Sequence, residues 1–447
     1  MSTSDWLFTQ QAHRTNIFAP LSHLDLISFL KSNLKPISIA GQQFSSGGQT
    51  LVDDGIIVSL KRLNLISEIN LLNKEYTVEA GATWKDVLNT LVPYHLVPLE
   101  MQSYSSFSIG GSISVNAHGR MSRRVSDSII WMDIITIEGE IFRCSADLNP
   151  KLFFSVIGGY GLVAIIWRAH LKSRSNLNLI CRVYSHNQSL FEDIKYFAEK
   201  KPVLYNCEIS NIQRIHHIVW EAQSSELILK PASVQGDSLL GQLFSRFGEN
   251  VMALIGPAHA WYQTYHPYQI NGTKQLLSYE MGYNAKDLVP LTPFRLFQSL
   301  LQEYFLPLES LEKFKLELFQ LVESYRVNLL NLSIRLIHSK SLSSYLDWIN
   351  FEPGESGLKV AIVLYINIFN FIEAEPAYRE FTQTVIQLAL DLGGSWYLPY
   401  YPAFTKAQLL KAFPNLPQFI KIKKNYDPQN KLTSKFWQYC QNLNKSH

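Results

Sequence analysis

The chain of 447 residues has little cysteine. Its four cysteines are Cys144, Cys181, Cys207 and Cys440, and no two of them form CxxC. The sequence therefore argues against a paired-cysteine zinc or redox motif, and single cysteines far apart fit a reducing compartment. The histidines at 216–217, 259 and 266 lack acidic residues at ligand spacing, so we expect no metal site.

Charge of one sign and long apolar runs are also scarce. The formal net charge of +3 implies no strong field for nucleic acid or a membrane. No apolar run reaches the roughly 18 residues of a spanning helix, and the N-terminus lacks a basic region followed by an apolar core. We therefore expect a cytoplasmic protein. Residues 242–265 favour a buried helix over peripheral contact with a membrane, and residues 421–424, Lys-Ile-Lys-Lys, favour a solvated helix face.

Hydrophobic residues are abundant at 47%, and aromatic residues reach 13%. These fractions provide for packed cores and for cavities lined by rings. The length indicates two or three domains.

Strands alternate with short helices over residues 1–175. Residues 36–40, 55–60 and 76–80 are typical of strands, and residues 131–137 and 142–144 of a hairpin. Thr83 is a candidate N-cap for a following helix. We therefore predict an α+β domain here, because a purely parallel sheet would lack hairpins.

A second domain is expected over residues 176–385. Residues 311–325 and 374–392 favour helices, with Gly393 and Gly394 ending the second, while residues 331–337 and 358–367 favour strands. Residues 386–447 form an aromatic, lysine-rich C-terminal segment.

Three glycine clusters lie in the first domain, at residues 41–49, 107–120 and 158–161. Small side chains allow backbone N–H groups to approach a flat or phosphorylated ligand closely. The first cluster follows a strand, but it is not GxGxxG, which argues against a Rossmann dinucleotide site. Each cluster alone also fits an ordinary turn. Together they favour a long ligand such as a flavin dinucleotide.

The order of four segments resembles the FAD-binding domain of the vanillyl-alcohol-oxidase and p-cresol-methylhydroxylase type of flavoprotein. These segments are Ser-Ile-Ala-Gly to Gly-Gly-Gln over 38–49, Thr-Val-Glu-Ala-Gly over 77–81, Ser-Ile-Gly-Gly to His-Gly-Arg over 108–120, and Gly-Gly-Tyr-Gly-Leu over 158–162. The likeness looks closest to bacterial sugar and alcohol oxidoreductases, such as decaprenylphosphoryl-ribose oxidases and aldonolactone oxidases. It implies a two-subdomain FAD-binding domain and an α+β substrate domain with a large antiparallel sheet, to which residues 386–447 return.

The resemblance implies that residues 39–49 hold the pyrophosphate and that Ile165 contacts the adenosine. It also implies that Ser103, residues 108–111 and residues 115–118 line the flavin. Tyr397 would close over the ring system. The residues so assigned to FAD are Ile39, Ala40, Gly41, Gln42, Gln43, Phe44, Ser45, Ser46, Gly47, Gly48, Gln49, Ser103, Ser108, Ile109, Gly110, Gly111, Val115, Asn116, Ala117, His118, Ile165 and Tyr397.

Phe44 occupies the position at which many similar proteins carry a histidine bonded covalently to the flavin. Phenylalanine has no nucleophilic atom. We therefore predict that FAD is bound noncovalently.

Oxidation of C–OH to C=O needs a hydride acceptor and a group that receives the hydroxyl proton. His118 and Tyr400 are the candidate bases, and Tyr397 is expected to orient the reactants. Tyr400 stands where sugar-oxidising relatives have a lysine, which weighs against a phospholipid-sugar substrate. Substrate contacts are predicted for Arg120, Gln302, Tyr304 and Arg335.

The resemblance implies an FAD-dependent oxidoreductase that oxidises an alcohol or lactol carbon of a sugar-like or other small hydroxylated substrate. Oxygen or a separate carrier would accept the electrons. Tyr397-Leu-Pro also resembles cytokinin dehydrogenases, so amine oxidation is a second hypothesis. A flavin-binding protein without catalysis is a third, because the histidine and the lysine are both replaced. The oligomeric state stays open.

Overall fold

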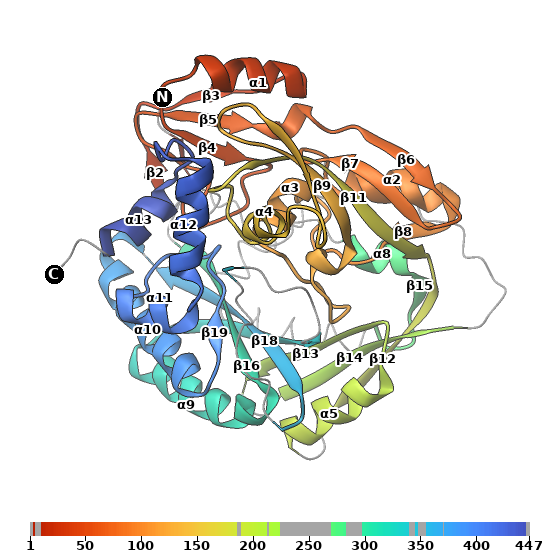
Figure 1. Cartoon of the computed structure of the whole chain (residues 1–447). Helices are drawn as coiled ribbons and strands as arrows, with labels where there is room; N and C mark the ends of the chain where they lie inside the picture. Colours follow the sequence, from red (N-terminus) through yellow and green to blue (C-terminus); the bar gives the residue numbers. More distant parts are fainter. Residues whose placement is uncertain are drawn as a thin grey trace.

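A computed structural model describes residues 3–4, 10–185, 189–211, 214–223, 270–282, 297–338, 345–346, 355–369 and 371–443. Residues 242–265 lie outside these ranges. Figure 1 shows two halves that face each other, with the N-terminal sheets in one half and a large sheet in the other.

The N-terminal half contains two main sheets. The smaller is parallel in the order β3-β5-β4, and α1 (His23–Ser32) connects two of its strands, which are β3 (Asn16–Phe18), β4 (Ile37–Ala40) and β5 (Ile56–Ser59). The larger is antiparallel in the order β10-β9-β11-β7-β6, with β8 beside β11. Its strands are β6 (Ile66–Asn70), β7 (Glu75–Glu79), β8 (Leu96–Pro98), β9 (Ile129–Ile135), β10 (Ile141–Cys144) and β11 (Ile165–Ser175). A further short pair joins β1 (Thr3–Ser4) and β2 (Gln11–Ala12).

Short helices cover this larger sheet. They are α2 (Trp84–Leu91), α3 (Ile109–Ser114) and α4 (Pro150–Val156). The predicted N-cap is confirmed, because the Thr83 hydroxyl accepts from the Asp86 backbone N–H in a capping box. The hairpin of β9 and β10 is confirmed as well, and Gly139 in its turn has a φ of 81°, which favours glycine.

The second half is built on one eight-stranded antiparallel sheet in the order β15-β12-β14-β13-β17-β18-β16-β19. Its strands are β12 (Asn178–Ser185), β13 (Leu204–Asn211), β14 (Arg214–Ala222), β15 (Lys274–Leu276), β16 (Phe297–Pro307), β17 (Asn328–His338), β18 (Leu358–Phe369) and β19 (Ser395–Trp396). The chain passes from one large sheet to the other between β11 and β12. The predicted fold class, an α+β FAD-binding half beside a large antiparallel sheet, is confirmed.

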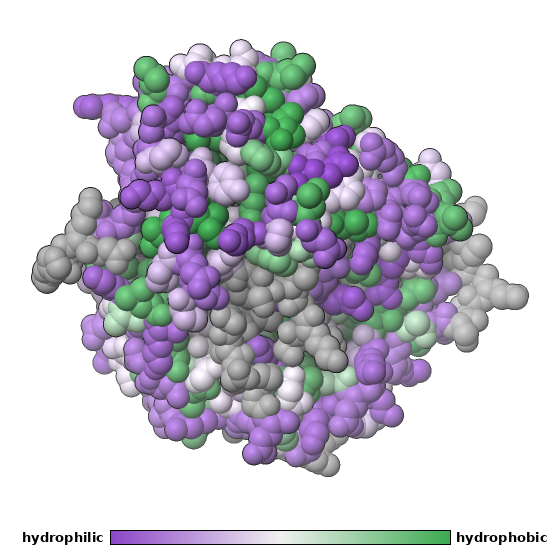
Figure 2. Space-filling model, viewed as in Figure 1, coloured by the Kyte–Doolittle hydropathy of each residue, from purple (hydrophilic) through white to green (hydrophobic). Residues whose placement is uncertain are grey.

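Helices cover the outer side of this sheet, namely α5 (Leu190–Lys200), α9 (Leu311–Ser324) and α10 (Phe371–Asp391), while α8 (Leu277–Met281) follows β15. Figure 1 shows α3 and α4 across from the inner side. The long α10 ends where predicted, since Gly393 adopts a φ of 76° just beyond it. None of the described helices is both long and apolar enough to cross a membrane. On the face drawn in Figure 2, described hydrophobic residues are scattered among hydrophilic ones.

The C-terminal segment runs through α11 (Lys406–Ala412), α12 (Leu416–Tyr426) and α13 (Lys435–Leu443) back to the N-terminal half. The prediction of a solvated face at residues 421–424 is wrong for Lys423, which is buried. Its ammonium donates to the Asp427 carboxylate at 2.7 Å and to the backbone carbonyls of Leu162 at 2.9 Å and Leu432 at 2.7 Å. This charge is buried because three acceptors satisfy it.

Candidate FAD site

The loop of residues 41–49 follows β4 and is held by close backbone approaches. A Cβ on Gly41 would lie 2.0 Å from the Ser108 hydroxyl, and one on Gly47 would lie 2.4 Å from the Tyr400 carbonyl oxygen. The Ser46 backbone N–H donates to the Pro399 carbonyl at 3.1 Å. The loop is therefore fixed between α3 and the segment around residue 400.

The second glycine cluster forms α3, whose first turn packs closely on the end of β7. The Ser108 hydroxyl caps the helix by accepting from the Gly111 N–H at 3.3 Å. A Cβ on Gly110 would lie 2.7 Å from the Ala80 Cβ, so only glycine allows this contact without a shift. The third cluster meets the same helix, because the Gly158 and Tyr160 N–H groups donate to the Ile113 and Ser114 carbonyls at 3.0 and 2.9 Å.

All three clusters border one cavity. Most of the residues assigned to FAD line it: Ile39, Gly41, Gln42, Gln43, Phe44, Ser45, Ser46, Gln49, Ser103, Ser108, Gly110, Gly111, Val115, Ala117, His118, Ile165 and Tyr397. The other five, Ala40, Gly47, Gly48, Ile109 and Asn116, lie beside the lining residues in the chain but do not line the cavity. Thr50, Gln102, Tyr160 and Gly161 also line it and come from the same segments.

The polar groups of this cavity fit a cofactor rich in hydrogen-bonding atoms. The hydroxyls of Ser45, Thr50 and Ser103 are buried and lack a hydrogen-bond partner in the described part of the chain. Buried hydroxyls are normally paired, so these three are suited to bind the phosphates, ribityl chain or ring edge of FAD. Phe44 stacks on Phe107 with ring centroids 4.6 Å apart. It adds an apolar side chain to the wall of the cavity.

His118, which follows α3 in the N-terminal half, meets Glu303 on β16 of the large sheet at the cavity. His118 Nε2 lies 2.6 Å from Glu303 Oε1, and both side chains are 3% exposed. The Tyr400 hydroxyl donates to Glu303 Oε2 at 3.2 Å. Burial alone would raise the pKa of the Glu303 carboxyl, but His118, Arg335 and the Tyr400 hydroxyl together lower it. Glu303 is therefore ionised at neutral pH.

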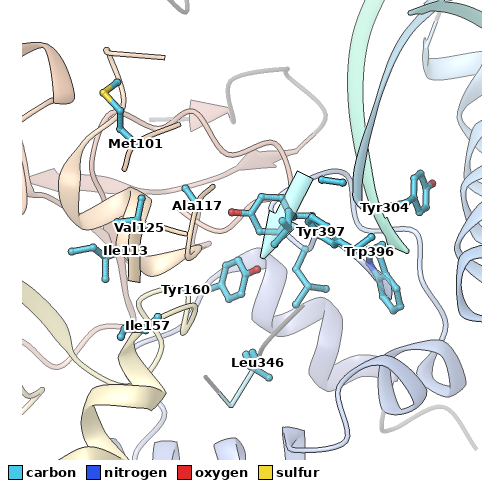
Figure 3. Packing of buried hydrophobic residues seen from close by; sticks show 14 of the residues in the cluster. Met101, Ile113, Ala117, Val125, Ile157, Tyr160, Tyr304, Leu346, Trp396 and Tyr397 are labelled. Carbon is cyan, nitrogen blue, oxygen red and sulfur yellow. The ribbon is translucent and has the colours of Figure 1, made fainter. Parts of the chain in front are cut away.

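Tyr397 joins the two halves. Its hydroxyl donates to the Val115 carbonyl at 2.8 Å, and its backbone N–H donates to the Glu303 carbonyl at 2.9 Å. Figure 3 shows its hydroxyl directed toward Ala117, with Tyr160 nearby and Tyr304 on the far side. Burial raises the pKa of both Tyr397 and Tyr400 well above the ordinary value, so both phenols act as donors rather than as bases.

Three of the predicted substrate residues lie away from the cavity. Gln302 and Tyr304 point to the opposite face of β16, where Gln302 donates to Tyr378 at 2.6 Å and accepts from Tyr304. Arg120 binds Glu280 through its backbone carbonyl and its carboxylate. Arg335 is the fourth, and it does line the cavity.

Glu303 is the residue that the sequence argument missed. Alternate residues of a strand face opposite sides, so Glu303 faces the cavity while its neighbours Gln302 and Tyr304 face α10. The sequence did contain a signal for Glu303, because it is the one carboxylate in the otherwise largely apolar strand β16. Tyr104 and Tyr365, which also line the cavity, carried no comparable signal.

A model of the FAD binding domain family matches residues 20–145, which contain the first two glycine clusters and most of the larger N-terminal sheet. Over these residues the chain is similar to FAD binding domains. FAD as the cofactor is thereby confirmed, as is the coarser resemblance to p-cresol-methylhydroxylase-type flavoproteins.

Known relatives share part of the chain. Cytokinin dehydrogenase 3 of Arabidopsis thaliana is 30% identical over 182 residues, which cover 37% of this chain and 34% of the relative. Cytokinin dehydrogenase 10 of Oryza sativa subsp. japonica is 28% identical over 186 residues, or 38% of this chain and 34% of the relative. An uncharacterised oxidoreductase of the fasciation locus of Rhodococcoides fascians is 27% identical over 139 residues, which cover 30% of this chain and 31% of the relative. The chain thus matches about a third of the length of these relatives.

Proposed function

We propose that the protein is an FAD-dependent oxidoreductase that oxidises a carbon bearing a hydroxyl group, as in an alcohol or lactol. The observation that carries this proposal is the buried pair of His118 and Glu303, with Nε2 and Oε1 at 2.6 Å, in the wall of the FAD cavity. When bound, FAD supplies a hydride acceptor. Oxygen or a separate carrier would then take the electrons.

The protein's own groups provide the proton acceptor. The hydroxyl proton passes to the His118–Glu303 pair, and the ionised carboxylate stabilises the imidazolium that forms. Tyr400 holds the second oxygen of Glu303, which fixes the carboxylate in place. Of the two candidate bases, Tyr400 stays protonated, which leaves His118 to receive the proton.

The test is anaerobic mixing of the purified holoprotein with panels of alcohols, sugars and amines while the visible absorbance of the flavin is followed. Reduction by a hydroxylated compound supports the proposal. Glu303→Gln should slow that reduction by about 10²–10⁴-fold, the usual range for a positioned acid–base group. Glu323→Gln, an exposed carboxylate at the end of α9, is the matched control and should leave the rate unchanged. Bound FAD that no class of compound reduces would favour a protein without catalysis.

Amine oxidation is the second candidate. The similarity to proteins named cytokinin dehydrogenase favours it, together with the Tyr397-Leu-Pro segment. Arg335 in the cavity wall weighs against a protonated amine, because like charges repel. Reduction of the flavin by amines and not by hydroxylated compounds would decide for this candidate.

A further inference from the structure

Arg335 places a positive charge in the wall of the cavity. It lies on β17, is half-buried and lines the cavity with Glu303, Tyr365 and Tyr400. Its Nε is buried and has no hydrogen-bond partner among the described residues, and the structure shows no ion pair between its guanidinium and a described carboxylate. A guanidinium in this position has donors that a bound ligand can occupy.

Phenol groups surround this guanidinium. Tyr104, Tyr365 and Tyr400 line the cavity together with Arg335. Burial raises the pKa of each phenol above the ordinary value, so these groups stay protonated. Burial would lower the pKa of Arg335, but the nearby Glu303 carboxylate acts in the opposite direction and the pKa is raised, so the guanidinium stays charged. This part of the cavity is therefore rich in donors.

We propose that Arg335, assisted by the Tyr365 hydroxyl, binds a carboxylate on the substrate, so that the substrate is a hydroxy acid such as a sugar acid. This inference rests on the proposed oxidation of a hydroxylated carbon. It adds a recognition site to the pair formed by His118 and Glu303.

The charge balance of the cavity favours a carboxylate over other groups. The two oxygens of Glu303 are engaged by His118 and Tyr400, and no ion pair joins this carboxylate to the charged Arg335. A carboxylate matches one guanidinium in charge and in its two-pronged geometry. A phosphate dianion would leave an extra negative charge near Glu303, and a neutral polyol would leave the buried guanidinium without an anionic partner.

The strand register sets the spacing between Glu303, beside the reacting carbon of the proposed substrate, and Arg335, which would bind its carboxylate. Glu303 lies opposite Val363, which lies opposite Ser333, and Arg335 is two residues further along β17. Strand spacing and rise place the Cα atoms of Glu303 and Arg335 about 12 Å apart. Both side chains line the same cavity, and the proposal places the substrate carboxylate several carbons from the carbon that is oxidised.

The test compares matched acid and neutral compounds on the holoprotein. The pairs are D-galacturonate with D-galactose, D-gluconate with D-sorbitol, and L-lactate with propane-1,2-diol. Flavin reduction and the shift of the flavin spectrum on titration are both measured. We expect the acids of the longer pairs to be preferred by about 10-fold to 100-fold over their neutral partners, the range of a charged hydrogen bond.

The variants are Arg335→Gln, which removes the charge, and Arg335→Lys, which keeps the charge but loses the two-pronged geometry. Arg335→Gln should abolish the preference, and Arg335→Lys should retain part of it. Arg62→Gln, at an exposed arginine of the N-terminal half, is the control. Flavin content of each variant reports whether it folds, and Arg335→Lys keeps the test open if Arg335→Gln does not fold.

The outcomes separate this inference from the function on which it rests. Neutral compounds that reduce the flavin as well as their acids overturn the carboxylate site while the oxidase or dehydrogenase activity stands. If Arg335→Gln slows flavin reduction equally for the acid and for its neutral partner, Arg335 acts on the flavin. That result also overturns the carboxylate site. Acids that shift the spectrum through Arg335 without reducing the flavin support the site and contradict the oxidation. No response to any acid overturns the inference.

Discussion

Lys423→Met tests the buried charge that attaches the C-terminal segment to the FAD-binding half. The Lys423 and Asp427 side chains are 5% and 0% exposed, and their charged atoms are 2.7 Å apart. Removal of the ammonium leaves the Asp427 carboxylate buried, with the Lys431 and Leu432 N–H groups, at 2.8 and 2.9 Å, as its remaining donors among the residues that the structure describes. Breaking a buried pair in this way costs about 3–5 kcal/mol.

Two carbonyls also lose their donor in this variant. The Leu162 carbonyl is the more consequential, because it directly follows the third glycine cluster at residues 158–161. We therefore expect Lys423→Met to weaken FAD retention as well as to lower the free energy of unfolding. Flavin content after gel filtration measures FAD retention, and urea unfolding followed by circular dichroism measures the free energy of unfolding.

Lys424→Met is the matched control on the same helix. Lys424 is exposed, so its replacement should change the free energy of unfolding by no more than about 0.5 kcal/mol. The reasoning is refuted if Lys423→Met and Lys424→Met have the same stability. A loss of stability with full flavin content would refute the link to the glycine cluster alone.

Three further predictions concern the cofactor cavity. Because Phe44 offers no nucleophile, denatured protein passed through an ultrafiltration membrane should release all its flavin into the filtrate, and flavin retained on the polypeptide would contradict this. Gly110→Ala places a Cβ 2.7 Å from the Ala80 Cβ and should cost about 1–3 kcal/mol of stability, with loss of flavin. In the described part of the chain the Cβ of Gly111→Ala meets the Ser108 hydroxyl alone, so this variant should lose less stability in thermal unfolding. Glu303 has a lowered pKa when folded, so its ionised form stabilises the protein above its ordinary pKa near 4.5, and this stabilisation is lost as the pH falls through the folded value. Glu303→Gln should therefore lower the free energy of unfolding by about 1.5–3 kcal/mol near pH 7. If the stability difference between this variant and the unchanged protein fails to narrow in acid, the lowered pKa of Glu303 is contradicted.

The architecture of the FAD-binding half could be predicted largely from local patterns. Thr83 marked the start of α2, Gly393 marked the end of α10, and glycine spacing marked the three segments that meet at α3. These signals are local, because a cap or a close backbone approach needs particular residues at one position.

The substrate side of the site could be predicted less well. The choice of Gln302 and Tyr304 over Glu303 identified the right strand but the wrong face, and only the packing of α10 shows which face is which. Lys423 was expected in solvent, and no local pattern in the sequence indicated its burial. Its acceptors come from residue 162 and from residues beyond its own helix. Contacts between distant segments leave no periodic pattern in the sequence, and His118 and Glu303 are 185 positions apart.

The division of the cavity between two sheets has an evolutionary consequence. The residues around the glycine clusters come from the N-terminal half, whereas Glu303, Arg335 and Tyr365 come from strands of the other sheet. Substitutions on those strands can alter which compounds are accepted while the dinucleotide cradle is preserved. Selection can therefore act on the two surfaces separately, and descendants of one ancestral cradle can diverge in substrate without the need to evolve a new way of holding the coenzyme.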